Sequence, residues 1–207
     1  MSAPPQDRGR QPVAGIVLAG GRSSRMGEPK ALLDVEGTSF LERAARVLAE
    51  GGCDPVFVVV PPGETGERLL ELARRAGARG IVNPEPDAEQ IDSLRVGLEA
   101  LEPHVVAAAV LPVDHPRVRT ATIAALLAAF HASGAPIVRP IYGDRPGHPV
   151  LFARDLWTEL RAPDLEEGAR DVVHRHHGEI EEVPVDDPGL VIDVNTPEEY
   201  AREVKAV

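Results

Sequence analysis

The chain has 207 residues, a length typical of one domain with a sizeable hydrophobic core. Its net charge of −11 argues against nonspecific binding of DNA or RNA, and it has no run of about 18 apolar residues that could form a membrane span. A single cysteine, Cys53, cannot form an internal disulfide and fits a reducing compartment. We therefore expect a cytoplasmic protein with a loose, flexible tail over residues 1–12 and a single domain over residues 13–207.

Apolar runs alternate with helical patterns along the chain, which indicates an α/β protein with a mostly parallel sheet. Strands are predicted at 13–18, 56–60, 80–82, 105–111, 136–142, 148–152, 180–185 and 190–193. The segment 148–152 is the expected hairpin partner of 136–142. Helices are predicted at 39–50, 67–76, 93–101, 120–131, 155–160 and 167–176 and after Thr196. Capping-box sequences begin at Ser39 and at Thr196.

The loop after the first predicted strand concentrates glycines and cations. It reads Leu18-Ala19-Gly20-Gly21-Arg22-Ser23-Ser24-Arg25-Met26-Gly27-Glu28-Pro29-Lys30. Its glycines let the backbone approach a ligand closely, and its guanidinium, ammonium and backbone N–H donors together are typical of a polyphosphate site. The spacing matches neither a dinucleotide-binding fingerprint nor a P-loop, because Gly27 comes late and precedes a glutamate. The alternative to a polyphosphate site is an ordinary strand-to-helix loop with solvated side chains.

This loop resembles the signature loop of the Rossmann-like nucleotidyltransferases, and it is similar to the molybdenum-cofactor branch, whose members join a nucleotide to molybdopterin. The resemblance implies an α/β, three-layer Rossmann-like nucleotidyltransferase fold with a mostly parallel central sheet. It implies catalytic roles for Arg22, Arg25 and Lys30. It also implies that the nucleotide is bound by Leu18, Ala19, Gly20, Gly21, Arg22 and Lys30.

Two carboxylates follow apolar runs. Asp114 comes after the predicted strand 105–111, and Asp193 comes after the apolar run 190–192. Ligands of open α/β sheets bind at the carboxyl ends of strands, and Mg²⁺ is typically held by one or two carboxylates plus phosphate oxygens. On the residues alone, Asp114 could simply form a turn and Asp193 could cap the last helix. The family resemblance favours both as Mg²⁺ ligands.

Two further segments resemble the molybdopterin cytidylyltransferase subgroup. They are Gly147-His148-Pro149-Val150-Leu151-Phe152 and Gly168-Ala169-Arg170. The resemblance implies that Arg145, His148 and Arg170 bind the acceptor, although His148 alone could be a core histidine and Arg170 a solvated one. The nearby His174, His176 and His177 lack the spacing of a helical zinc site and are expected at the surface.

The stretch 83–97 matches the family's nucleotide-binding loop at both ends. The match implies that Asn83, Asp92 and Ser93 contact the nucleotide. Many relatives carry a Gly-Met-Ser-Ser-like run where this chain has Glu89-Gln90-Ile91-Asp92. The choice of base therefore stays open on this stretch.

The resemblance implies Mg²⁺-dependent transfer of a nucleotide to the phosphate of molybdopterin, with release of pyrophosphate. The two acceptor-side segments favour CTP as the donor. Guanylyl transfer to molybdopterin and nucleotidyl transfer to a sugar phosphate or another small phosphate are alternatives. A non-catalytic nucleotide-binding regulatory protein is the alternative from another class, and the joint presence of Lys30, Asp114 and Asp193 argues against it. A recipient enzyme like xanthine dehydrogenase is a further expected partner, whereas nucleic acid and membrane are not.

Overall fold

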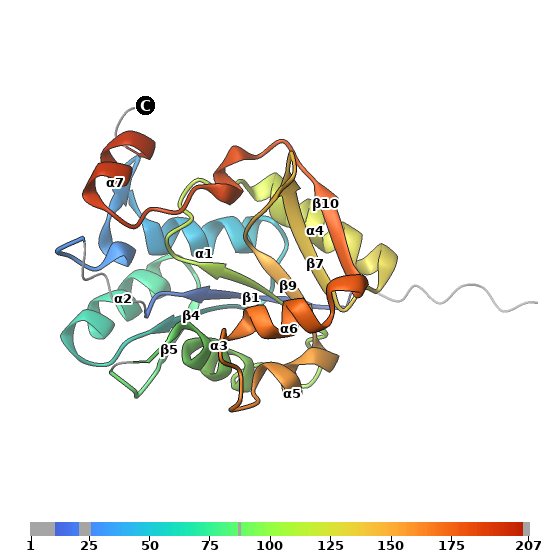
Figure 1. Ribbon diagram of the computed structural model, residues 1–207. Helices are drawn as coiled ribbons and strands as arrows, with labels where there is room; N and C mark the ends of the chain where they lie inside the picture. The colour runs from blue at the N-terminus through green and yellow to red at the C-terminus, as the bar shows by residue number, and fades with distance from the viewer. Residues whose placement is uncertain (1–10, 21–25, 87, 205–207) are drawn as a thin grey trace, which may run out of the picture.

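The computed structural model describes residues 11–20, 26–86 and 88–204 (Figure 1). Its main sheet has eight strands in the order β10-β7-β9-β6-β1-β4-β5, with β8 paired to β7. These strands are β1 (Val13–Leu18), β4 (Val56–Val60), β5 (Arg79–Val82), β6 (Ala107–Pro112), β7 (Ile137–Tyr142), β8 (Arg145–Pro146), β9 (Val150–Ala153) and β10 (Ile180–Pro184). A separate two-stranded sheet pairs β2 (Asp34–Val35) with β3 (Thr38–Ser39).

Helices cover both faces of the main sheet (Figure 1). The α-helices are α1 (Phe40–Glu50), α2 (Gly63–Arg75), α3 (Gln90–Glu99), α4 (Thr120–Ser133), α5 (Trp157–Leu160), α6 (Ala169–Arg175) and α7 (Pro197–Glu203). The short 3₁₀ helices are η1 (Lys30–Leu32), η2 (Arg154–Leu156), η3 (His177–Glu179) and η4 (Pro188–Val191).

The alternation of side chains along β1 divides the core into two halves. Val13 and Val17 pack into the cluster that includes residues of α1, α2 and α4. Ala14, Ile16 and Leu18 point to the opposite face, where α3, α5 and α6 contribute to a second cluster. Both faces of the central strands are thus buried, which explains why these strands are continuously apolar. The predicted three-layer α/β architecture is confirmed.

The pairing of the strands also agrees with the expectation of a mostly parallel sheet. β1 lies between β6 and β4 and runs parallel to both. β9 is antiparallel to β6 and to β7, with Ile137 opposite Phe152, so the predicted pairing of 136–142 with 148–152 is present. Because β1, β4 and β6 are parallel, their carboxyl ends meet at one edge of the sheet, and the loops that follow them lie side by side.

Local capping signals place two helices as expected. The Ser39 hydroxyl accepts from the Glu42 N–H at 3.2 Å, and a Glu42 carboxylate oxygen accepts from the Ser39 N–H at 3.3 Å, so α1 begins with a capping box. Thr196 and Glu199 form the same box at the start of α7. By contrast, α2 starts at Gly63, four residues before the predicted 67, because its first turn contains no apolar residue that would mark it.

The prediction of a strand at 190–193 was wrong, because Leu190 and Val191 belong to η4 and residues 192–193 have no regular secondary structure. The buried Asp187 carboxylate accepts from the Gly189 N–H at 3.0 Å and from the Arg119 N–H at 2.9 Å. These bonds turn the chain, and Pro188 at the first helical position cannot donate to a strand partner. The run is apolar because Leu190 is buried in the core, and not because the segment pairs with the sheet.

Two single residues are buried in the core. Cys53 is buried, and burial raises the pKa of its thiol to about 12. Trp157 is 3% exposed, and its indole N–H donates to the Phe152 carbonyl at 3.3 Å. Across the described residues, no helix is both long enough and apolar enough to cross a bilayer. The expected tail lies outside the described residues as far as residue 10.

Candidate functional site

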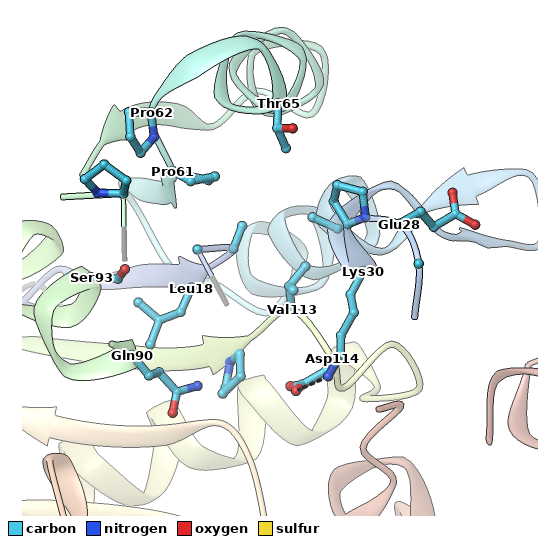
Figure 2. A pocket seen from close by; sticks show the side chains of 17 residues that line it. Leu18, Glu28, Lys30, Pro61, Pro62, Thr65, Gln90, Ser93, Val113 and Asp114 are labelled. Atoms are coloured by element: carbon cyan, nitrogen blue, oxygen red, sulfur yellow. Dashed lines mark hydrogen bonds and ion pairs between the residues drawn. The ribbon is translucent and has the colours of Figure 1, made fainter. Parts of the chain in front are cut away.

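A cavity of about 540 Å³ opens at the carboxyl ends of β1, β4 and β6 (Figure 2). Four chain segments meet around it: the residues after β1, the Pro61–Pro62 turn after β4 with Thr65, the start of α3, and the Pro112–Asp114 turn after β6. The predicted site residues that line it are Leu18, Ala19, Gly20, Lys30, Ser93 and Asp114. Topology alone brings these residues together, as expected for parallel strands that end at one edge.

Lys30 links three segments that are far apart in the sequence. Its ammonium donates to Asp114 Oδ2 at 3.3 Å and also to the Asn195 side-chain carbonyl. The Asn195 amide in turn donates to the Asp193 carboxylate. Lys30 is largely shielded, with 14% of its side chain exposed, whereas 25% of the Asp114 side chain reaches solvent. The two predicted carboxylates therefore belong to one charge-compensated network in which a cation sits between the segments that carry them.

Main-chain hydrogen bonds hold the segments that carry this network. The Val194 N–H donates to the Asp114 carbonyl at 2.9 Å, which ties the C-terminal segment to the loop after β6. The His148 N–H donates to the Leu190 carbonyl at 3.1 Å. Asp187 anchors the same segment at its start. The side chains of Asp114 and Asp193 are thereby held by main-chain contacts that do not depend on their own charge.

The start of α3 forms the floor of the cavity. The buried Asn83 amide donates to Ser93 Oγ at 3.3 Å. A β-carbon added at Gly20 would lie 2.9 Å from that hydroxyl, so only glycine allows the loop after β1 to pass so close to Ser93. Asn83 lies behind Ser93 and lines neither this cavity nor the one beside it.

Asp92 also lines neither cavity. Its carboxylate accepts from the Glu89 N–H at 3.0 Å and from Arg95 Nη1 at 2.8 Å. The side chain thus stabilises the first turn of α3 rather than reaching toward the nucleotide cavity. The Asp92 position predicted from the family loop is therefore occupied by a helix cap in this chain.

A second cavity of about 1030 Å³ adjoins the first, and Leu18, Gln90 and Pro112 line both. Arg145, His148, Arg170 and Asp193 line the second cavity, as does His115. The guanidinium groups of Arg145 and Arg170 have no hydrogen bond or ion pair to another described residue. The floor of the second cavity is apolar and is formed by Ile91, Leu94, Val110, Val150, Phe152 and Val173. The second cavity thus offers two available guanidinium groups above an apolar floor.

The rings of His115 and His148 are in contact at the second cavity, with centroids 4.7 Å apart and ring planes tilted by 51°. The Nδ1 atom of each ring is buried without a hydrogen-bond partner among the described residues. Burial, followed by the neighbouring His115 ring, lowers the pKa of His148 to about 3. Burial also lowers the pKa of His115, although Asp114 and Asp193 partly oppose it. His148 is therefore a neutral imidazole that can exchange hydrogen bonds with a ligand but offers it no charge.

Three of the predicted residues, Gly21, Arg22 and Arg25, lie outside the described residues, so their expected roles rest on the sequence. Conversely, the sequence interpretation missed Asn195 and His115. Asn195 is two residues from Asp193, and His115 directly follows Asp114, so adjacency was the available signal. It also missed that His174 and His177 line the second cavity.

The oxygen donors at the junction fit a divalent metal that is shared with a substrate. Asp114 faces the first cavity and Asp193 the second, and Mg²⁺ is commonly held by one or two carboxylates completed by phosphate oxygens. Within the described ranges, no group of three or more His, Cys, Asp or Glu side chains could hold a metal alone. The donor set therefore suits an ion that arrives with a phosphate ligand.

Comparison with known proteins identifies the family. Residues 15–180 match the MobA-like NTP transferase domain. The chain belongs to this family. It is a nucleotidyltransferase of MobA-like type, and the expected Rossmann-like nucleotidyltransferase fold and enzymatic class are confirmed.

Individual relatives differ in what they are named for. The chain is 30% identical to a probable molybdenum cofactor guanylyltransferase of Opitutus terrae, over 92% of this chain and 94% of that protein. It is 32% identical to the 2-C-methyl-D-erythritol 4-phosphate cytidylyltransferase of Streptomyces coelicolor, over 88% of this chain and 75% of that protein. Among solved structures, Rv0371c of Mycobacterium tuberculosis has a TM-score of 0.80 at 28% identity, covering 95% and 98% of the two chains. Rv0371c has also been solved in complex with manganese.

Proposed function

We propose that this nucleotidyltransferase joins a nucleotide, CMP from CTP, to the phosphate of a molybdopterin-type acceptor and releases pyrophosphate. The observation that carries the proposal is the meeting of two cavities at Leu18, Gln90 and Pro112, beside the network of Lys30, Asp114 and Asp193. In this proposal the first cavity holds the nucleoside triphosphate and the second holds the acceptor.

The proposed reaction is the attack of an acceptor phosphate oxygen on the α-phosphorus of the triphosphate. The bond from the α-phosphorus to the bridging oxygen of pyrophosphate breaks as the new P–O–P bond forms. The attacking oxygen is already ionised, so no side chain has to remove a proton from it. Both reactants are anionic, and the barrier is therefore mainly one of charge repulsion and alignment.

Different residues of this chain counter the charge repulsion and align the reactants. Lys30 lines the first cavity, with Arg22 and Arg25 expected beside it from the sequence, and these cations counter the charge of the triphosphate. Gly20 and Ser93 shape the nucleotide side of the cavity, and Arg145 and Arg170 bind the acceptor phosphate. Asp114 and Asp193 would hold a divalent ion, Mg²⁺, which supplies Lewis-acid polarisation of the phosphate oxygens when bound.

The second cavity favours a large acceptor over a small sugar phosphate. Its volume of about 1030 Å³ and its apolar floor suit a ring system that carries an anionic tail. The neutral His148 can hydrogen-bond with polar ring atoms of such an acceptor. The Gly147–Phe152 segment, which resembles the cytidylyltransferase subgroup, supports CMP transfer. The Opitutus terrae relative supports GMP as the second candidate.

The test is pyrophosphate release by the purified protein with Mg²⁺ and molybdopterin, with CTP, GTP and ATP supplied one at a time. We expect release with CTP that depends on molybdopterin. Release with GTP alone would replace CMP by GMP in the proposal. Absence of release with each nucleotide, from protein shown to bind that nucleotide, would contradict transfer to molybdopterin. Release with 2-C-methyl-D-erythritol 4-phosphate in its place would identify a small acceptor instead.

A further inference from the structure

Helix α6 presents two different faces. Arg170, Val173 and His174 line the second cavity, and His177 follows one turn later on the same side. Val172 and His176, four residues apart, lie on another face. Val172 is fully buried in the core, and His176 is directed to α5. The helix therefore carries cavity-lining side chains on one face and its attachments to the rest of the molecule on the other.

Each ring nitrogen of His176 is hydrogen-bonded to a carboxylate. Its Nε2 lies 2.8 Å from Glu159 Oε2 on α5, and its Nδ1 lies 2.8 Å from Glu179 Oε1 on η3. An ionised carboxylate only accepts hydrogen bonds, so this arrangement favours the imidazolium form of the ring, in which both nitrogens donate. The other Glu159 oxygen accepts from Arg175 Nη1 at 2.9 Å. Glu159 thus receives two cations from the end of α6.

We propose that His176 is a positioning residue, which fixes α6 against α5 and thereby holds Arg170 and His174 at the rim of the second cavity. The inference rests on the proposed function only in treating this cavity as the site of the anionic acceptor. His176 does not itself line that cavity and acts through the helix.

The attachments of α6 show why its C-terminal end needs this contact. At the N-terminal end, the Glu167 N–H donates to Asp171 Oδ2 at 2.9 Å, and Gly168 passes so close to α3 that an added β-carbon would lie 3.3 Å from Ile91 Cβ. Val172 is the buried residue of the helix. Ala169 and Val173 also pack against the core, but all three apolar side chains precede the last two residues of this seven-residue helix. The ion pairs of His176 and Arg175 fix the other end.

The charge on His176 makes this attachment sensitive to pH. The groups that face the ring are Glu159 from α5, Glu179 from η3 and the neighbouring Arg175. The two carboxylate hydrogen bonds, with Glu159 the larger effect, raise the pKa of His176 above its usual value. The attachment is therefore present below the usual histidine pKa and is lost as the pH rises through the raised value.

The experiment measures anion binding with inorganic sulfate, which keeps one charge state across the pH range used. The ring resonances of His174 and His177 report binding by NMR in the full-length protein at pH 6.5. We expect His176→Gln to raise the sulfate Kd about threefold, because Arg175 still reaches Glu159 in that variant. Glu159→Gln weakens both attachments and should raise the Kd further, about tenfold. These ranges follow the modest strength of partly exposed ion pairs.

The matched control is His104→Gln. His104 is also paired with a glutamate, Glu102, at 3.4 Å, but it precedes β6 and so lies at the opposite end of that strand from the cavity. We expect it to bind sulfate like the wild type. The wild-type Kd should approach that of His176→Gln as the pH rises through the pKa of His176, measured from its own ring resonance.

Equal sulfate affinity in the wild type, His176→Gln and Glu159→Gln would overturn the inference. Identical pH profiles for the wild type and His176→Gln would overturn it as well, as would a wild-type protein with no saturable sulfate shift. A retained sulfate effect in a protein without nucleotidyl transfer would instead contradict the proposed function, and the positioning role would stand.

Discussion

Asp114 and Lys30 face each other in the first cavity, although 84 positions separate them in the sequence. Of the two, Asp114 has the more exposed side chain, and its backbone carbonyl is engaged independently by Val194. Its carboxylate can therefore be neutralised without disturbing the fold. The role of the Asp114 side chain in the reaction can therefore be tested separately from the role of its backbone in the fold.

We predict that Asp114→Asn lowers kcat for pyrophosphate release about 10²–10³-fold, the usual effect of removing one preorganised charged group from a reacting centre. The asparagine keeps the size of the side chain but loses the charge that a divalent ion requires. The melting temperature should stay close to that of the wild type. Asp144→Asn, in the exposed turn between β7 and β8, is the control and should be fully active. Near-normal turnover by Asp114→Asn would remove this residue from the proposed metal site.

His148 predicts a dependence of stability on acidic pH. Its pKa is about 3 in the folded protein and 6.5 in an unfolded chain, so the unfolded state binds a proton that the folded state excludes. The contribution of His148 is complete above about pH 6.5 and declines as the pH falls toward 3, by at most about 1.4 kcal/mol per pH unit. Urea unfolding between pH 7 and 4 should show a shallower decline for His148→Asn than for the wild type. A decline of equal slope in both proteins would count against a buried neutral ring.

At the scale of whole elements, the close approach of α3 to the sheet fixes the position of this helix. Gly97 of α3 lies over β1, and a β-carbon there would come within 2.9 Å of Ile16 Cγ2 and 3.3 Å of Val59 Cγ2. Those two side chains are fully buried and cannot move aside freely. The position of α3, and with it that of Ser93 in the nucleotide cavity, therefore depends on glycine at 97.

We predict that Gly97→Ala lowers the free energy of unfolding by about 1–3 kcal/mol, the usual cost of adding a methyl group to a packed core. The shift of α3 should also weaken nucleotide binding. Urea unfolding and a nucleotide titration measure the two effects. Glu99→Ala changes an exposed position of the same helix and should alter neither. A Gly97→Ala protein of unchanged stability would show that α3 is not packed as described.

The capping box of α1 gives a second prediction at this scale. Ser39→Ala removes the hydroxyl that accepts from the Glu42 N–H and should lower the free energy of unfolding by about 1 kcal/mol. Thr158→Ala, at an exposed position of α5 that is not the N-cap of that helix, serves as the comparison. Urea denaturation that gives equal values for the two variants would contradict a stabilising cap at Ser39.

The whole molecule shows which features a sequence can reveal. Uninterrupted apolar runs predicted β1, β4 and β6 because these strands are buried on both faces, and the parallel topology then placed Asp114 beside the loop after β1. Contacts made across the fold leave no local pattern. The bond from Lys30 to Asn195 spans 165 positions, and the buried Asp187 that turns residues 188–191 away from a strand is supported by Thr122, 65 positions earlier.

The faces of α6 illustrate the same limit. The spacing of the histidines at 174, 176 and 177 predicts surface residues, and His174 and His177 are indeed exposed, but it does not reveal that they line a cavity. Their placement depends on which face of the helix meets α5, which only the packing of Val172 and Glu159 decides. The cap formed by Asp92 was hidden for a related reason, because its partner, the Glu89 N–H, carries no sequence signal.

The most direct test of the central claim follows the α-phosphate itself. The purified protein is incubated with Mg²⁺, molybdopterin and CTP labelled at the α-phosphorus, and the products are separated. We predict that the label appears in a molybdopterin dinucleotide, one equivalent for each pyrophosphate released, and that Asp114→Asn forms almost none. Label that remains in CTP, or that is released as free CMP with molybdopterin unchanged, would contradict nucleotidyl transfer across the junction of the two cavities.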